Sequence, residues 1–149
     1  MPQPPSYVLD TNVLIHYARA SVAGRAIEAR FQFRAMAFKP SVCVVTIGEV
    51  LAFSQRRRWG KPKLALLEAL LDSVVQLSID PPEILRAYAD IHTHCVNSGL
   101  ALGDNDLWIA AVTKVTGACL ITTDRDFDSI SPMIIRRTFV DPMTGVIEQ

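Results

Sequence analysis

Four acidic residues stand where their carboxylates could act together on a metal ion. Asp10 directly follows the apolar run "YVL", Glu49 follows the β-branched run "SVCVVT" by about one helical turn, and Asp124 follows the run "CLITT". Asp106 lies in the first turn of a predicted helix. Carboxylates held close together raise one another's pKa values unless a cation neutralises them. Because no histidine or cysteine cluster accompanies these acids, an all-oxygen site for Mg²⁺ or Mn²⁺ is favoured over a zinc site.

Helix capping is an alternative explanation for each acid taken alone. Thr46 and Glu49 fit a capping box, in which Thr46 is the N-cap residue and Glu49 reaches back to it. Asp104, Asp106 and Asp124 would each favour a helix N-terminus through the helix dipole. Capping does not explain why acids follow three separate strands. We therefore expect a shared site, with capping left open for each individual acid.

The elements that must position these acids alternate between strand and helix. Strands are predicted at 7–9, 41–46, 74–79, 118–123 and 134–140 (the last at an edge), helices at 11–17, 24–38, 47–58, 61–73, 83–97 and 104–117, and a turn at 126–130. Short, continuously apolar strands between helices are typical of an α/β fold whose central, mostly parallel sheet is covered on both faces. Ligands bind beyond the carboxyl ends of such strands, so the acids should meet at one edge of the sheet.

Composition indicates an ordinary globular protein with one domain over residues 1–149. Half of the residues are hydrophobic, and 15 basic residues offset 15 acidic ones, so net charge predicts no partner. The cysteines Cys43, Cys95 and Cys119 lack metal-site spacing and are expected to be buried free thiols in a reducing cytoplasm. The N-terminal "MPQPPS" does not resemble a signal peptide, and no apolar stretch is long enough to span a membrane.

Four motifs together resemble those of PIN-domain proteins, most closely the VapC-type toxin ribonucleases of toxin–antitoxin pairs. They are "VLDTNVLI" at 8–15, "TIGEV" at 46–50, "NDLWIAA" at 105–111 and "LITTDRDF" at 120–127. The resemblance covers nearly the whole chain. It implies a three-layer α/β/α fold, Mg²⁺ or Mn²⁺ dependence, an RNA substrate, a homodimer and inhibition by a cognate antitoxin.

The resemblance also assigns residues. It makes Asp10, Glu49, Asp106 and Asp124 the metal-binding acidic quartet, with Asp10 as principal or bridging ligand and Glu49 either a ligand or the residue that orients the attacking water. Which of Asp124 and Asp126 ligates stays open. Six further residues are expected beside the metal ligands: Asp104, Asp126, Thr11, Asn12, Thr122 and Thr123. The implied reaction is phosphodiester hydrolysis that leaves a 5′-phosphate and a 3′-hydroxyl.

A basic segment could bring RNA to the acidic edge. The stretch "SQRRRWGKPK" at 54–63 contains Trp59, a candidate base-stacking platform. Its basic residues are Arg56, Arg57, Arg58, Lys61 and Lys63. The alternative is a solvated helix end whose cations favour its own dipole.

Two other functions compete with the nuclease. A phosphatase of the haloacid dehalogenase type would need a second aspartate two residues after Asp10, where this chain has Asn12. A catalytically silent binding module would be expected to lack one of the acids, and all four are present. The predicted helices at 24–38 and 47–58 could form a groove for an antitoxin or a homodimer seam, and residues 132–149 receive no role.

Overall fold

The computed structural model describes residues 5–149. The first four residues, which begin the stretch used to exclude a signal peptide, lie outside the described residues. The elements are β1 (Tyr7–Leu9), α1 (Thr11–Arg19), α2 (Val22–Phe31), β2 (Ser41–Cys43), α3 (Val44–Arg56), α4 (Lys61–Asp72), β3 (Val75–Leu77), α5 (Pro82–Ser98), α6 (Asp104–Thr116), β4 (Cys119–Thr122), the 3₁₀ helix η1 (Arg125–Ile130), β5 (Arg136–Val140) and β6 (Ile147–Glu148).

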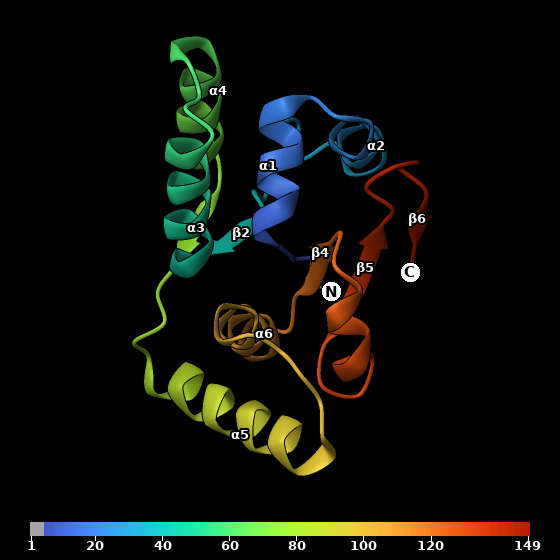
Figure 1. Cartoon of the computed structure of the whole chain (residues 1–149). Coiled ribbons are helices and arrows are strands. Elements are labelled where there is room, and N and C mark those ends of the chain that lie inside the picture. The colour runs from blue at the N-terminus through green and yellow to red at the C-terminus, as the bar shows by residue number, and fades with distance from the viewer. Residues whose placement is uncertain (1–4) are drawn as a thin grey trace.

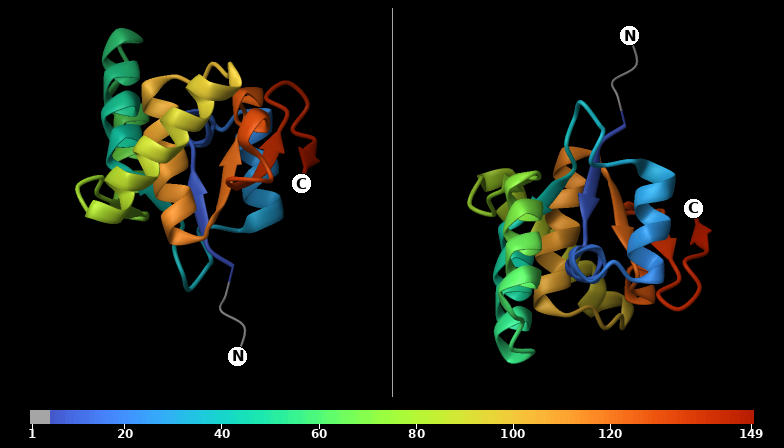
Figure 2. Two further views of the ribbon diagram at one scale, coloured as in Figure 1. Left: turned by 90° about the horizontal axis from the view of Figure 1, so that it is seen from below. Right: turned by 90° about the horizontal axis from the view of Figure 1, so that it is seen from above.

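A six-stranded sheet in the order β3-β2-β1-β4-β5-β6 forms the centre of the molecule. Neighbouring strands from β3 to β5 are all parallel, as expected, and β1 and β4 run side by side in the same direction (Figure 2). β6 pairs antiparallel with β5. The prediction that the strand near residues 134–140 forms the edge is therefore wrong, because the tail of the chain, residues 132–149, adds β6 as a further strand.

Alternating side chains of the short strands bury the two faces of the sheet in two separate cores. Val8 packs among residues of α5 and α6, whereas its neighbour Leu9 packs among residues of α1, α2 and α4. Leu120 and Ile121 divide in the same way on β4. This alternation follows from the two-residue period of a strand. Helices accordingly cover both faces, as Figure 1 shows, and the expected three-layer α/β/α architecture is confirmed.

The predicted helix at 24–38 is too long. α2 ends at Phe31, and Gln32 adopts a left-handed conformation with φ of 52° as its C-cap. Phe31 and Phe33 stack with ring centroids 5.2 Å apart, and both rings pack edge-on against Tyr7 at the start of β1. The apolar spacing beyond Phe31 thus reflects an aromatic cluster with β1, not a helical face.

The predicted strand at 41–46 is also too long, and this changes the reading of Glu49. β2 ends at Cys43, which is the N-cap residue of α3. Thr46 lies within the first turn of α3 and is completely buried. The capping box between Thr46 and Glu49 is therefore wrong, since Thr46 does not occupy the N-cap position.

The remaining expectations concern the cysteines and membrane-spanning segments. Across residues 5–149 the cysteines are free thiols, with Cys43 and Cys95 buried as expected, but Cys119 is only half-buried. None of the helices in this part of the chain is long and apolar enough to cross a bilayer.

Candidate metal centre

The candidate site lies where the chain connections diverge at the carboxyl edge of the sheet. After β1 the chain passes to β2 on one side, whereas β4 lies on the other side of β1. Open parallel sheets form a ligand-binding crevice at such a switch point. Asp10 directly follows β1, and Asp124 comes two residues after β4.

Asp10 is a buried carboxylate held by two hydrogen bonds. Its side chain is the N-cap of α1, where Oδ1 accepts from the backbone N–H of Thr11 at 2.7 Å. Oδ2 accepts from the Thr122 hydroxyl, also at 2.7 Å. The same Thr122 oxygen accepts from the backbone N–H of Asp124 at 2.9 Å. Thr122 thereby links the acids that follow β1 and β4. Asp10 is therefore both the cap of α1 and part of the candidate site, so the two explanations do not exclude each other.

Glu49 reaches the site from α3 through a threonine. The Thr11 hydroxyl donates to Glu49 Oε1 at 2.6 Å and lies 3.3 Å from the Thr46 hydroxyl. Glu49 is half-buried, so one side chain on α1 fixes its carboxylate beside Asp10. Sequence reasoning assigned Thr46 to a helix cap and missed this contact, because the residues involved are 35 and 38 positions apart.

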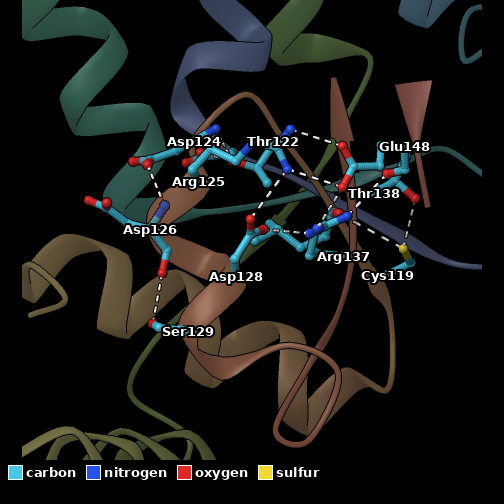
Figure 3. Close-up of polar contacts among 12 residues, drawn as sticks. Cys119, Thr122, Asp124, Arg125, Asp126, Asp128, Ser129, Arg137, Thr138 and Glu148 are labelled. Atoms are coloured by element: carbon cyan, nitrogen blue, oxygen red, sulfur yellow. Dashed lines mark hydrogen bonds and ion pairs between the residues drawn. The ribbon is translucent and has the colours of Figure 1, made fainter. Parts of the chain in front are cut away.

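Three other acids form the tightest group. One carboxylate oxygen from each of Asp106, Asp124 and Asp126 lies within 4.8 Å of the other two. Asp106 comes from the first turn of α6. Asp124 is the N-cap of η1, and its Oδ1 accepts from the backbone N–H of Asp126 at 2.8 Å. Figure 3 shows the carboxylates of Asp124 and Asp126 projecting in the same direction.

The electrostatics of the site disfavour ionised carboxylates. Burial raises the pKa of Asp10 from 3.8 to about 6, and the nearby charges of Asp124 and Glu49 add to the effect. Burial also raises the pKa of Asp106 to about 7, reinforced by the charges of Asp10, Asp124, Glu49 and Asp126. All five carboxylates therefore influence one another electrostatically, and a divalent cation would relieve their mutual repulsion.

The donor set fits a hard divalent cation. Mg²⁺ binds oxygens at about 2.1 Å, so oxygens on one ion lie about 3 to 4 Å apart. The three oxygens within 4.8 Å of one another therefore need only a small side-chain adjustment to share an ion. The arrangement can hold Mg²⁺ or Mn²⁺ through oxygen ligands alone.

The other residues expected beside the site occupy varied places. Asp104 is exposed in the first turn of α6, where Gly103 is the N-cap residue, and its Oδ1 accepts from the Tyr88 hydroxyl at 3.4 Å. Asn12 is exposed at the second position of α1, and Thr123 is half-buried between Thr122 and Asp124. Of the two threonines proposed to orient groups, Thr122 makes the contacts with Asp10 and Asp124.

The basic segment lies at the far ends of the helices that begin near the acids. Arg56 and Arg57 end α3 with their guanidinium groups 5.9 and 5.3 Å from the centre of the Phe53 ring. Arg19, at the end of α1, lies 5.2 Å from the same ring. Sequence analysis missed Arg19, since nothing in the linear sequence joins it to the segment.

Trp59 cannot act as the expected base-stacking platform in this conformation. It is only 9% exposed and packs edge-on against Phe53 with ring centroids 5.8 Å apart. Arg58, Lys61 and the other cations of the segment are exposed or half-buried, so charge is what this segment presents to solvent.

Comparison with known proteins agrees with the geometry. The model of the PIN domain family matches residues 7–131. The chain is 32% identical over 128 residues to "Ribonuclease VapC5" of Mycobacterium tuberculosis, covering 85% of this chain and 89% of that protein. It is 25% identical over 125 residues to "Ribonuclease VapC2" of Haemophilus influenzae, covering 83% of this chain and 91% of that protein.

Solved structures share the fold. VapBC2 from Rickettsia felis, bound to a promoter DNA fragment, superposes with a TM-score of 0.78 at 17% identity, covering 91% of this chain and 99% of that chain. VapBC-5 from Mycobacterium tuberculosis, a toxin–antitoxin system, gives a TM-score of 0.61 at 30% identity, covering 89% of this chain and 99% of that chain.

Proposed function

The chain belongs to the PIN-domain family and, within it, to the VapC ribonucleases, and we propose that it is a metal-dependent endoribonuclease, the toxin of a type II toxin–antitoxin pair. The observation that supports the chemistry is the meeting of Asp106, Asp124 and Asp126, with Asp10 and Glu49 beside them, at the carboxyl edge of the sheet. The proposed substrate is RNA, cleaved in the cytoplasm.

Each acid receives a role that follows from its contacts. Asp106, Asp124 and Asp126 would hold Mg²⁺ or Mn²⁺, and we propose both Asp124 and Asp126 as ligands. Both oxygens of Asp10 accept hydrogen bonds, which hold the carboxylate in one orientation. Asp10 would thus provide a fixed negative charge and a further ligand oxygen. Glu49 accepts a single hydrogen bond from Thr11 and keeps its second oxygen available to bind the ion or orient a water.

The chemistry divides between the ion and the chain. A bound divalent ion supplies a lowered pKa for water and charge neutralisation at the phosphoryl oxygens. Glu49 accepts a proton from the attacking water, and Thr11 keeps the Glu49 carboxylate in place. The water oxygen bonds to phosphorus as the bond from phosphorus to the 3′-oxygen breaks, and a proton from solvent completes the 3′-hydroxyl. Thr122 fixes Asp10 and the backbone of Asp124, so that two ligand-bearing segments keep one spacing.

RNA approach requires positive charge near these carboxylates, because phosphates are repelled by them. Arg19, Arg56 and Arg57 surround Phe53 on helices that start at the site, and Arg58 and Lys61 follow. We assign these five cations to contacts with RNA phosphates. A helix rises about 1.5 Å per residue, which places Arg19 and Arg56 roughly 10–14 Å along α1 and α3 from Asp10 and Glu49.

An antitoxin is the proposed partner, as in the VapBC assemblies that this fold resembles. α2 and α3 offer exposed apolar side chains, with Val22 43% and Leu51 43% exposed. A homodimer is proposed as well, and the same helices are candidates for its seam.

The test is substitution of Asp10 by Asn. Mn²⁺ affinity should fall at least about tenfold, and RNA cleavage on the order of 10²-fold or more. The melting temperature of the metal-free protein should stay or rise, because the substitution removes a buried charge. Asp72→Asn, an exposed acid at the end of α4, is the matched control and should leave all three unchanged. Metal-dependent cleavage at the wild-type rate by folded Asp10→Asn would refute the assignment of this site. Absence of cleavage by the wild-type protein supplied with Mg²⁺ or Mn²⁺ would favour a catalytically silent module.

A further inference from the structure

The tail of the chain contacts the segment that carries two of the proposed ligands. The PIN-domain match ends at residue 131, yet the chain continues through β5 and β6. β6 lies at the edge of the sheet, beside β5 (Figure 1). Glu148, the last residue of β6, reaches across to η1.

Four charged side chains form a closed ring between η1 and the tail. Glu148 accepts two hydrogen bonds from Arg125, at 3.1 and 2.9 Å, in a bidentate pair. Arg137 of β5 donates to Asp128 at 2.8 Å and to Glu148 at 3.4 Å, and Arg125 closes the ring to Asp128 at 3.3 Å. The Arg125 guanidinium also lies 3.7 Å from the centre of the Phe139 ring. Figure 3 shows this ring of contacts.

The side chains of η1 divide between three surroundings. Asp124 and Asp126 project to the candidate metal centre, Arg125 and Asp128 face the tail, and Phe127 is completely buried in the core. Short 3₁₀ helices have poor hydrogen-bond geometry and little stability of their own. The clustered carboxylates of Asp124 and Asp126 repel each other and Asp106. Holding them together therefore needs support from outside η1.

We propose that Glu148, through Arg125 and Arg137, clamps η1 and thereby positions Asp124 and Asp126 for metal binding. The inference rests on the proposed function, in which these acids are ligands. Single exposed ion pairs contribute little. This ring differs because it combines a bidentate arginine–carboxylate pair, an arginine over an aromatic face and Arg137, whose side chain is only 12% exposed. Glu148 is thus a positioning residue that acts through others.

Glu148→Gln tests the clamp, because it removes the charge while keeping the shape. Amide hydrogen exchange of residues 125–130 should accelerate in the metal-free variant. Mn²⁺ binding, measured by electron paramagnetic resonance, should weaken about tenfold, the lower end of the effect of losing an outer-shell partner. Arg125→Gln should have the same two effects. The effects of the double variant should be clearly less than additive, since both substitutions break the Arg125–Glu148 pair.

Arg136→Gln is the matched control. Arg136 is the exposed neighbour of Arg137 on β5, and it donates to the carbonyl of Gly117 instead of contacting η1. It should change neither exchange of η1 nor Mn²⁺ affinity. Unchanged exchange in folded Glu148→Gln, or faster exchange with wild-type Mn²⁺ affinity, would overturn the inference, as would additive effects in the double variant. A wild-type protein that binds Mn²⁺ but cleaves no RNA would contradict the proposed function. The clamp would still be supported by the effects of Glu148→Gln on exchange and Mn²⁺ affinity.

Discussion

At the scale of single residues, the site is defined by carboxylates that resist ionisation. Asp10 and Asp106 have raised pKa values, mainly because burial disfavours their charged forms and then because other carboxylates lie close. Protons and divalent cations therefore compete for the same oxygens. This competition connects the stability of the metal-free protein to pH.

The first prediction is that Asp106 makes the metal-free protein less stable as pH rises. Its pKa is about 7 in the folded protein against 3.8 as the ordinary value, so the folded state keeps a proton that the unfolded chain releases. Between pH 4 and 7 this difference lowers the free energy of unfolding as pH increases. We expect Asp106→Asn to recover roughly 2 kcal/mol at pH 7, after allowance for solvent screening of a half-exposed group.

Urea unfolding at a series of pH values measures this effect. The difference between wild type and Asp106→Asn should be small near pH 4 and grow toward pH 7. Because groups outside the acidic site titrate equally in both proteins, the difference reports Asp106 together with the carboxylates that interact with it. In the wild type, Mn²⁺ affinity should rise over the same interval, since the ion binds the deprotonated form. A difference that stays constant with pH would contradict the assignment.

The second prediction concerns the hydroxyl that joins two acid-bearing strands. Thr122→Val keeps the shape but leaves Asp10 Oδ2 buried without its 2.7 Å donor. An unsatisfied buried acceptor costs roughly 1–3 kcal/mol of unfolding free energy. Mn²⁺ binding should weaken as well, because Asp124 loses the oxygen that holds its backbone N–H.

Thr138→Val provides the control for this experiment. Thr138 is a buried threonine on β5, and its hydroxyl lies 3.4 Å from the Cys119 thiol, a weak hydrogen-bonding partner. The same chemical change there should cost little stability and leave Mn²⁺ affinity unchanged. Equal losses of affinity in both valine variants would show that the Thr122 contacts do not organise the site.

At the scale of elements, the presence and order of strands and helices were predictable, and their ends were less so. Short apolar runs place Asp10 and Asp124 after parallel strands, which is why the sequence alone brought them to one edge. The end of α2 was missed because Phe31 and Phe33 continue an apolar pattern while serving an aromatic cluster with Tyr7. Long-range partners were also missed, since no local pattern encodes a contact between distant segments.

The third prediction is that the end of α3 contributes to RNA binding through charge. The triple variant Arg56→Ala, Arg57→Ala, Arg58→Ala should bind single-stranded RNA more weakly at low salt. Each phosphate contact with a single strand contributes about 0.7 to the slope of log affinity against log salt. Loss of three contacts should therefore reduce the slope by about 2, with Mn²⁺ affinity unchanged.

A second triple variant separates local from global charge. Alanine at Arg25, Arg30 and Arg136 removes the same number of positive charges from α2 and β5. Filter-binding measurements over a range of salt concentrations should show a much smaller change in slope for this variant. Equal slopes for the two triple variants would mean that α3 presents only a solvated helix end.

At the scale of the whole molecule, the helices that carry exposed apolar side chains lie close to the acidic edge of the sheet. α1 and α3 start beside the acids and pack against each other, and α2 packs against α1. Val22 on α2 and both Val44 and Leu51 on α3 expose apolar surface. An amphipathic helix from a partner could cover this surface and extend a basic side chain to the carboxylates. Such a partner would block both RNA access and the ion.

The fourth prediction is that the protein arrests growth when expressed alone, and that a small partner relieves the arrest. The adjacent gene should encode a short protein with a DNA-binding N-terminal part and an amphipathic C-terminal segment. Co-expression should restore growth and suppress RNA cleavage in extracts, and Asp10→Asn expressed alone should be harmless at the same protein level.

Leu51→Glu tests where the partner binds. This variant should remain toxic but should not be neutralised by the partner, because a buried charge in the apolar contact is strongly unfavourable. If the wild-type protein is harmless at high level with Mg²⁺ and Mn²⁺ available, the toxin role fails while the fold and its metal centre are unaffected. If Leu51→Glu is still neutralised, the partner binds elsewhere, and the exposed apolar faces of α2 and α3 become the candidate homodimer seam.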